Sequence, residues 1–159
     1  MPNWIEGTLK LRGKRDNIRK FFNEGLEPSS CFGEERPLSE FITDDSSDDY
    51  LDYSFKNEPH IKGTRRAFIT GNYAELYKEY GTVCVDIKQA WSFDSNEKDL
   101  EAWKEIAKKY SIDLKLFGIE CGMEFCQELI ILHKEDKIIE NVTRYENWEW
   151  DCPFPRMGG

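Results

Sequence analysis

The residues best suited to chemistry lie in one short run in the first half of the chain. Residues 44–53 read Asp-Asp-Ser-Ser-Asp-Asp-Tyr-Leu-Asp-Tyr, which places five carboxylates and two tyrosines within ten positions. Carboxylates attract basic groups, and exposed tyrosines are common anchors of protein interfaces. We therefore predict a partner-binding surface that consists of Asp44, Asp45, Asp48, Asp49, Tyr50, Asp52 and Tyr53.

Two alternative interpretations of this run stay open. Asp and Ser favour turns and solvent, so residues 44–53 also fit a solvated, mobile loop. A cation site is the third alternative, although the run lacks the Gly and the terminal Glu of an EF-hand loop. Long irregular connections are uncommon in compact domains and are often functional.

The sequence contains no recognisable catalytic motif. It lacks G-x-S-x-G, H-E-x-x-H, a Walker loop and G-x-G-x-x-G. Glu120 and Glu124 flank a bend, and paired carboxylates can do acid–base work, but ordinary residues at a strand break are the alternative. His60 and His133 are far apart and have no neighbouring Cys pair. We therefore expect a protein that is not an enzyme and uses no metal or other cofactor.

The cysteines and the chain's hydropathy indicate a cytoplasmic protein. No C-x-x-C pair occurs, so we predict reduced and mostly buried thiols at Cys31, Cys84, Cys121, Cys126 and Cys152. No run of about 18 apolar residues could span a membrane, and the first residues do not resemble a signal peptide. We expect no contact with a membrane.

The net charge of −9 indicates the kind of partner. An acidic surface repels phosphate groups, so we predict no direct contact with nucleic acid and a basic protein surface as the partner. The alternative is that the charge only keeps the protein soluble.

The elements that position these residues follow from two periodicities. Apolar and polar residues alternate over several segments, which predicts strands; these segments are 4–11, 65–70, 82–90, 112–116 and 124–132. Residues 133–137 are polar and predict a hairpin turn. The tail, residues 144–151, alternates aromatic and acidic residues, which predicts an edge strand or an exposed aromatic patch.

Three helices are predicted from apolar residues at helical spacing. The first covers residues 17–24, with Asp16 as its cap and Gly25 as a left-handed stop. The second follows a capping box formed by residues 94–97 and continues to Tyr110. The third covers residues 73–80, with an aromatic face that we expect to pack into the core.

Together these elements predict one α+β domain over residues 1–152, with helices on one face of an antiparallel sheet. Residues 26–62 form a long, irregular, acidic insertion in this interpretation, and residues 153–159 form a frayed tail.

Several stretches resemble the YubB-type ferredoxin-like family of phage and plasmid proteins. Similar segments are the opening Met1-Pro2-Asn3-Trp4 with a strand ending at Gly13, the strand start Tyr80-Gly81-Thr82, the turn Ala90-Trp91-Ser92 and the segment Ile119-Glu120-Cys121-Gly122-Met123-Glu124-Phe125. The chain departs from the family at Val83-Cys84, where Lys-Trp is frequent, at Glu124, and in its Asp-rich run. The resemblance implies a ferredoxin-like α+β fold and transfers no active site.

The resemblance also implies a function. Such proteins belong to mobile elements and work in the cytoplasm of a bacterial host, and the length and acidity of this chain resemble those of anti-CRISPR proteins that act on type II effector nucleases. This implies an inhibitor that binds a type II CRISPR-associated nuclease and blocks DNA cleavage, by clamping the HNH-type domain rather than by mimicking DNA. The alternatives are a binding module for another host protein and a nucleic-acid-binding ferredoxin-like domain.

Overall fold

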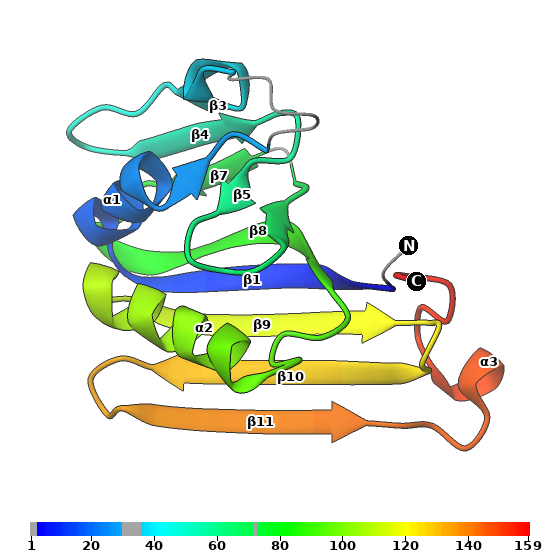
Figure 1. The fold of residues 1–159 in the computed structure, drawn as a ribbon. Coiled ribbons are helices and arrows are strands. Elements are labelled where there is room, and N and C mark those ends of the chain that lie inside the picture. Colours follow the sequence, from blue (N-terminus) through cyan, green and yellow to red (C-terminus); the bar gives the residue numbers. More distant parts are fainter. Residues whose placement is uncertain (1–2, 30–35, 72) are drawn as a thin grey trace.

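The computed structural model describes residues 3–29, 36–71 and 73–159. Its largest feature is an eight-stranded sheet in which all neighbouring strands are antiparallel (Figure 1). From one edge to the other, its strands are β11 (Lys137–Thr143), β10 (Phe125–Leu132), β9 (Asp113–Glu120), β1 (Trp4–Lys14), β8 (Tyr80–Ala90), β6 (Ala67–Ile69), β5 (His60–Ile61) and β2 (Leu26–Glu27).

Strand β1 organises this sheet. It pairs over its whole length with β8, from Trp4 opposite Ala90 to Lys14 opposite Tyr80, and it pairs with β9 on its other side. Alternate side chains of β1 enter the core, where Leu9 is fully buried. The strands predicted from alternation, including the hairpin of β10 and β11, are confirmed.

Two helices lie on one face of the sheet, in front of it in Figure 1. They are α1 (Arg15–Glu24) and α2 (Glu97–Tyr110). Phe21 of α1 meets the ring of Tyr110 at a centroid distance of 5.5 Å, and Trp103 of α2 is fully buried. Burial of these large rings is the main favourable contribution to folding in this layer.

A second sheet of three strands covers the other side of α1. It consists of β3 (Ile42–Asp44), β4 (Leu51–Phe55) and β7 (Tyr73–Leu76), in the order β3-β4-β7. Phe22 of α1 lies 5.0 Å from the ring of Tyr53 and 5.2 Å from that of Phe55. Contacts with α1 therefore fix the position of the small sheet and of the loop between β3 and β4.

The predicted ferredoxin-like fold is wrong. The molecule is mostly antiparallel sheet with few helices, although an α+β description is still compatible with it. The extra strands come from the interval 26–62, which was predicted to be irregular but contains β2, β3, β4, β5 and the short 3-10 helix Leu38–Glu40. Strands of two to five residues are too short to show a clear alternation.

Two further elements differ from their predictions. The predicted helix over residues 73–80 is strand β7 followed by the start of β8. The predicted edge strand over residues 144–151 is a loop with a single helical turn, α3 (Trp148–Asp151). Trp148 is buried there with Cys152, while Trp150 is 84% exposed.

The helix ends also differ in detail. The cap of α2 is Asn96 rather than Asp94, because the Asn96 side chain accepts the backbone N–H of Asp99 at 3.1 Å. Asp16 lies inside the first turn of α1 and does not cap it. Gly25 is right-handed, with φ −89°, and is needed because an added Cβ would lie 2.7 Å from the Phe21 carbonyl oxygen.

Candidate functional site

The acidic run forms a β-hairpin loop at one end of the small sheet. Asp44 ends β3, and Asp52 and Tyr53 belong to β4, so the structure brings all seven predicted residues together. The backbone N–H of Asp45 donates to the Asp52 carbonyl at 2.9 Å, and that of Ser47 donates to the Tyr50 carbonyl at 3.0 Å. The loop is therefore closed by its own hydrogen bonds.

Two arginines of α1 donate hydrogen bonds to the backbone of this loop. Arg15 donates to the carbonyl oxygens of Asp48 and Asp49, and Arg19 donates to those of Ser47 and Tyr50. Because the guanidinium groups bind backbone carbonyls, they leave the carboxylates of the loop free to face outward. Charge-assisted hydrogen bonds of this kind are the stronger class.

Asp44 and Tyr53 form a structural pair, in which Asp44 is exposed and Tyr53 is buried. Tyr53 is fully buried, and its hydroxyl lies 2.9 Å from Asp44 Oδ2 and 2.8 Å from Asn23 Oδ1. Burial raises the pKa of Tyr53, and the Asp44 carboxylate raises it further. Burial also opposes ionisation of Asp44, but hydrogen bonds from Ser46 and then Tyr53 outweigh it and lower the pKa of that carboxyl. The prediction that Tyr53 anchors a partner is therefore wrong.

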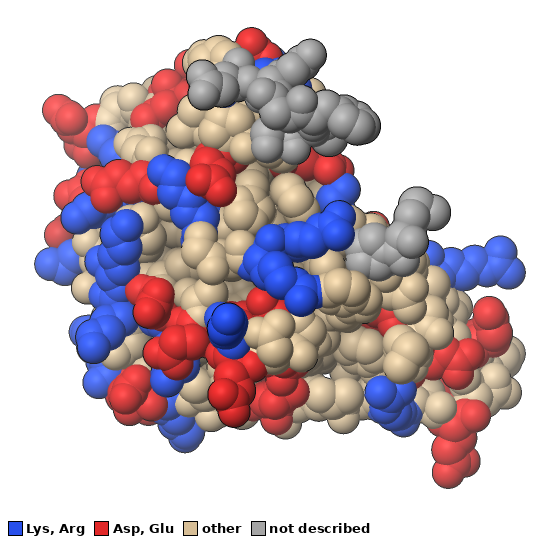
Figure 2. Space-filling view, in the orientation of Figure 1, with Lys and Arg blue, Asp and Glu red and all other residues tan. Residues whose placement is uncertain are grey.

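Three aspartates of the loop point into solvent. Asp45, Asp48 and Asp49 are exposed, and no hydrogen bond or ion pair within the described ranges engages their carboxylates. Acidic side chains stand over this loop at the upper left of Figure 2, whereas acidic and basic residues interleave over the helices.

Exposed tyrosines continue the same surface. Tyr50 stacks on Tyr77 with ring centroids 5.8 Å apart, and Tyr73 and Tyr77 are each 68% exposed, so the prediction that this aromatic face packs into the core is wrong. Glu75 raises the pKa of the Tyr77 hydroxyl by its negative charge. Glu75 also lies opposite Asp52 in the small sheet. We call this the acidic tyrosine surface, and it consists of Asp45, Asp48, Asp49, Tyr50, Asp52, Tyr73, Glu75 and Tyr77.

A second candidate site lies at the other end of the large sheet, beside the turn that follows β8. Trp91 has a left-handed backbone, with φ 67°, and its N–H donates to the Asn3 carbonyl at 2.8 Å. The N–H of Phe93 donates to the Oε1 atom of buried Gln127 at 2.9 Å. Two glycines, Gly7 and Gly118, face each other across β1 and β9, and a Cβ on Gly118 would lie 2.8 Å from Phe93 Cζ.

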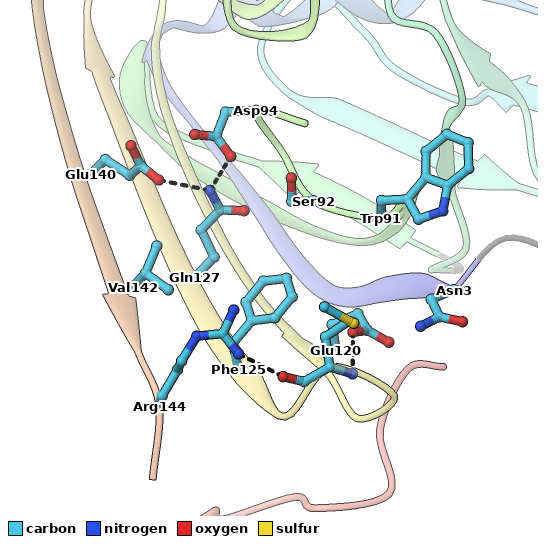
Figure 3. A pocket seen from close by; sticks show the side chains of 11 residues that line it. Asn3, Trp91, Ser92, Asp94, Glu120, Phe125, Gln127, Glu140, Val142 and Arg144 are labelled. Atoms are coloured by element: carbon cyan, nitrogen blue, oxygen red, sulfur yellow. Dashed lines mark hydrogen bonds between the residues drawn. The ribbon is translucent and has the colours of Figure 1, made fainter. Parts of the chain in front are cut away.

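This turn places Asp94 close to Glu140 of β11. Gln127 Nε2 donates to Asp94 Oδ1 at 2.5 Å and to Glu140 Oε1 at 3.1 Å (Figure 3). Burial raises the pKa of Glu140, and the neighbouring Asp94 carboxyl raises it further. The two carboxyl groups therefore share one amide.

Around these groups is an open pocket of about 480 Å³. Trp91, Met123, Phe125 and Val142 supply its apolar wall, and Arg144 crosses Phe125 to donate to the Met123 carbonyl at 2.7 Å (Figure 3). This pocket was not predictable from the sequence, because its residues come from four separate segments.

Glu120 closes the floor of the pocket and has a structural role. It is fully buried, and its carboxylate accepts the N–H groups of Gly122 at 2.9 Å and Met123 at 2.6 Å. Glu124 is exposed and left-handed, with φ 54°. Glu120 is thus occupied by the turn, which favours the interpretation of ordinary residues at a strand break over an acid–base pair.

No cysteine or histidine of the described residues lines the pocket or belongs to the acidic tyrosine surface. Cys126 and Cys152 are buried, Cys121 is half-buried and Cys84 is exposed, and all four are free; Cys31 falls outside the described residues. The two histidines each bind a carboxylate, since His60 contacts Glu27 and His133 contacts Asp113.

Over the described part of the chain, no group of three or more potential ligands could hold a metal ion. In the same part, no helix is long and apolar enough to cross a membrane.

Comparison of the chain with protein-family models, with curated proteins and with solved structures found no match.

Proposed function

We propose that this protein is a non-catalytic inhibitor that uses the acidic tyrosine surface to bind a basic surface of another protein. The observation that carries the proposal is the loop itself, in which Arg15 and Arg19 fix the backbone and leave three aspartates without partners among the described residues. The target class we propose is a type II CRISPR-associated nuclease. The protein would come from a mobile element and act in the cytoplasm of its bacterial host.

A fixed loop supports this proposal for an energetic reason. Ordering a backbone residue costs about 1–2 kcal/mol, and a binding loop that is disordered before contact must meet that cost at the moment of binding. Because the contacts of Arg15 and Arg19 already order the loop in the folded protein, the cost of ordering arises during folding and not on binding. The carboxylates can then steer association with a basic surface.

Charge density favours docking on a protein over imitation of DNA. Duplex DNA carries one negative charge per about 1.7 Å of its axis. The net charge of −9 is the balance of 31 acidic and 22 basic residues, and both kinds interleave on the face shown in Figure 2. The negative charge density of the chain is therefore much lower than that of DNA, whereas one local acidic loop suits a specific contact with a protein.

A nuclease that must reposition a domain is a suitable target for such a contact. Type II effectors bind DNA first, and their HNH domain must then dock before cleavage. An inhibitor that clamps this domain would block cleavage without displacing DNA. The tyrosines are exposed in the free protein and would become buried in the complex. They would then anchor the contact, which charge alone does not do.

The test is DNA cleavage by a panel of type II CRISPR nucleases with and without the protein, together with DNA binding by the same complexes. We expect blocked cleavage with retained DNA binding. The triple variant Asp45→Asn, Asp48→Asn, Asp49→Asn should associate about tenfold or more slowly at low salt.

A matched control removes the same charge elsewhere. The triple variant Glu105→Gln, Glu135→Gln, Glu146→Gln changes three exposed carboxylates outside the acidic tyrosine surface and should inhibit like the wild type. Equal inhibition by the two triple variants would contradict the assignment of the loop.

Two alternative functions keep some support. The same surface would serve a binding module for another host protein, and capture of a defined host partner that requires Asp45, Asp48 and Asp49 would favour it. A nucleic-acid-binding domain is supported by cations over aromatic rings on the large sheet, where Lys88 lies 5.3 Å from the ring of Trp4. A gel shift at low salt that is unaffected by the loop variant would favour this alternative.

A further inference from the structure

The pocket beside Trp91 holds two acidic groups, Asp94 and Glu140, in an arrangement fixed by Gln127. Gln127 is buried, and its Oε1 atom is already bound by the Phe93 N–H, so the orientation of its amide is set. Each of its two Nε2 hydrogens goes to one carboxyl group, Asp94 at 2.5 Å and Glu140 at 3.1 Å. The remaining carboxyl oxygens have no further donor within the described residues.

Asp94 is half-buried and Glu140 is exposed, and two like charges this close together repel each other. No Lys or Arg of the described chain forms an ion pair with either group. Arg144 lines the same pocket but donates to the Met123 carbonyl, with its guanidinium 5.4 Å from the Phe125 ring centroid. Burial, and after it the neighbouring Asp94 carboxyl, raises the pKa of Glu140, which agrees with two acidic groups lying close together.

The walls of the pocket suit a cation that carries hydrocarbon. Val142 is 51% exposed and Met123 is 57% exposed, so apolar surface stands open beside the carboxyl groups. Trp91 is also open, and its ring already accepts one guanidinium, that of Arg65 at 4.1 Å. Aromatic rings and carboxylates together form the usual environment of guanidinium and ammonium groups.

We propose that this pocket binds an organic cation, a guanidinium or primary ammonium group on a short apolar stem. The charged group donates hydrogen bonds to Asp94 and Glu140, and the stem packs on the open side chains of Met123 and Val142. The volume of about 480 Å³ exceeds what one such group needs, so part of a larger molecule fits as well. This inference is independent of the proposed inhibitor function, because it uses none of the residues of the acidic tyrosine surface.

The probe for the test is N-acetyl-L-arginine amide, and its neutral isostere N-acetyl-L-citrulline amide is the matched control. Titration is followed by nuclear magnetic resonance of the Gln127 side-chain amide and the Trp91 indole N–H. We expect saturable shifts with the arginine compound and affinity lower by about tenfold or more for the citrulline compound, because it lacks charge-assisted hydrogen bonds. Equal affinity for the two compounds would overturn the proposal.

Variants locate the binding. The double variant Asp94→Asn, Glu140→Gln keeps the shapes of both side chains and should lose about tenfold or more in affinity for the arginine compound. The double variant Glu105→Gln, Glu135→Gln makes the same change of charge elsewhere and should bind like the wild type. Circular dichroism confirms that each variant is folded, and unchanged binding by the Asp94, Glu140 variant would also overturn the proposal.

The same cation can come from a free small molecule or from an arginine side chain of a polypeptide. A blocked pentapeptide with a central arginine among glycines distinguishes these sources. Binding of the peptide as tightly as the amino-acid amide assigns the pocket to a protein side chain, and exclusion of the peptide assigns it to a small molecule; both outcomes support the site.

Discussion

Replacing Tyr53 with Phe tests how the acidic loop is fixed to the rest of the fold. The substitution removes one oxygen atom, which lies 2.9 Å from Asp44 Oδ2 and 2.8 Å from Asn23 Oδ1. The ring stays packed against Phe22, so no large cavity forms. The expected loss therefore comes from hydrogen bonding alone.

The magnitude follows from the charged acceptor. A hydrogen bond to a charged group contributes about 1.5–3 kcal/mol, and solvent around the exposed Asp44 reduces this to about 1–2 kcal/mol. For a chain of this length, that loss lowers Tm by about 2–8 °C. Urea unfolding at pH 7 followed by circular dichroism measures the same loss as a lower midpoint with an unchanged slope.

The pH dependence gives a second, independent check. Burial raises the pKa of Asp44, but hydrogen bonds from Ser46 and Tyr53 lower it overall below its ordinary value of 3.8. The ionised carboxylate therefore adds stability above pH 3.8, and this stability is lost as the pH falls through the lower pKa of the folded state. The deficit of the Tyr53→Phe variant should shrink over that interval.

Tyr50→Phe is the matched control, because it removes the same atom from a half-buried tyrosine of the same loop. No hydrogen bond of the Tyr50 hydroxyl is present among the described residues, so its stability should equal that of the wild type. Equal stability of the Tyr53→Phe protein and the wild type at pH 7, or a deficit that persists unchanged in acid, would refute the reasoning.

Three further predictions concern the large sheet. Gly118→Ala places a Cβ 2.6 Å from Ile5 Cγ1 and 2.8 Å from Phe93 Cζ, so thermal unfolding should show a loss of about 1–3 kcal/mol. Unchanged stability would mean that both side chains move aside freely. Glu140→Gln should be at least as stable as the wild type at pH 7. The pKa of Glu140 is raised in the folded protein, so ionisation of this carboxyl destabilises the fold as the pH rises above 4.5, and the variant does not ionise. A marked loss of stability in urea unfolding would contradict this. Burial raises the pKa of Cys126 to about 11, so a thiol reagent at pH 7 should label exposed Cys84 quickly and Cys126 only after unfolding, and equally rapid labelling of both would contradict their burial.

The long regular elements were predictable from sequence because their patterns extend over many residues. The alternation along β1 and the apolar stripe of α2, with Trp103 on it, each contain enough repeats to identify the element. The short strands were not predictable in this way, because pairing with neighbours decides them. Among the described residues, strand β7 pairs with β4 and not with the strands next to it along the chain.

Residues 73–77 show how two patterns can compete. Tyr73 and Tyr77 are four residues apart, which suits one face of a helix, but Tyr73, Glu75 and Tyr77 also alternate with Ala74 and Leu76. The strand forms because β4 offers hydrogen bonds along residues 73–76 and the core accepts Ala74 and Leu76. Attention to this alternation would have identified the exposed tyrosines.

The acidic loop and the pocket differ in how far sequence could reveal them. The loop residues are adjacent in the chain, so their grouping was predictable, but the roles of Arg15 and Arg19 were not, because nothing in the sequence connects them with positions 47–50. Asp94 and Gln127 are 33 residues apart and meet only through the order of the strands. Long-range contacts of this kind require the fold.

The most direct test of the central claim measures DNA cleavage and DNA binding by type II CRISPR nucleases in the presence of the wild-type protein and of the Asp45→Asn, Asp48→Asn, Asp49→Asn variant. The account predicts that the wild type blocks cleavage while DNA stays bound, and that the variant inhibits at least about tenfold less well. Full cleavage by every nuclease in the presence of the wild type would contradict the proposed target, and equal inhibition by wild type and variant would contradict the proposed surface.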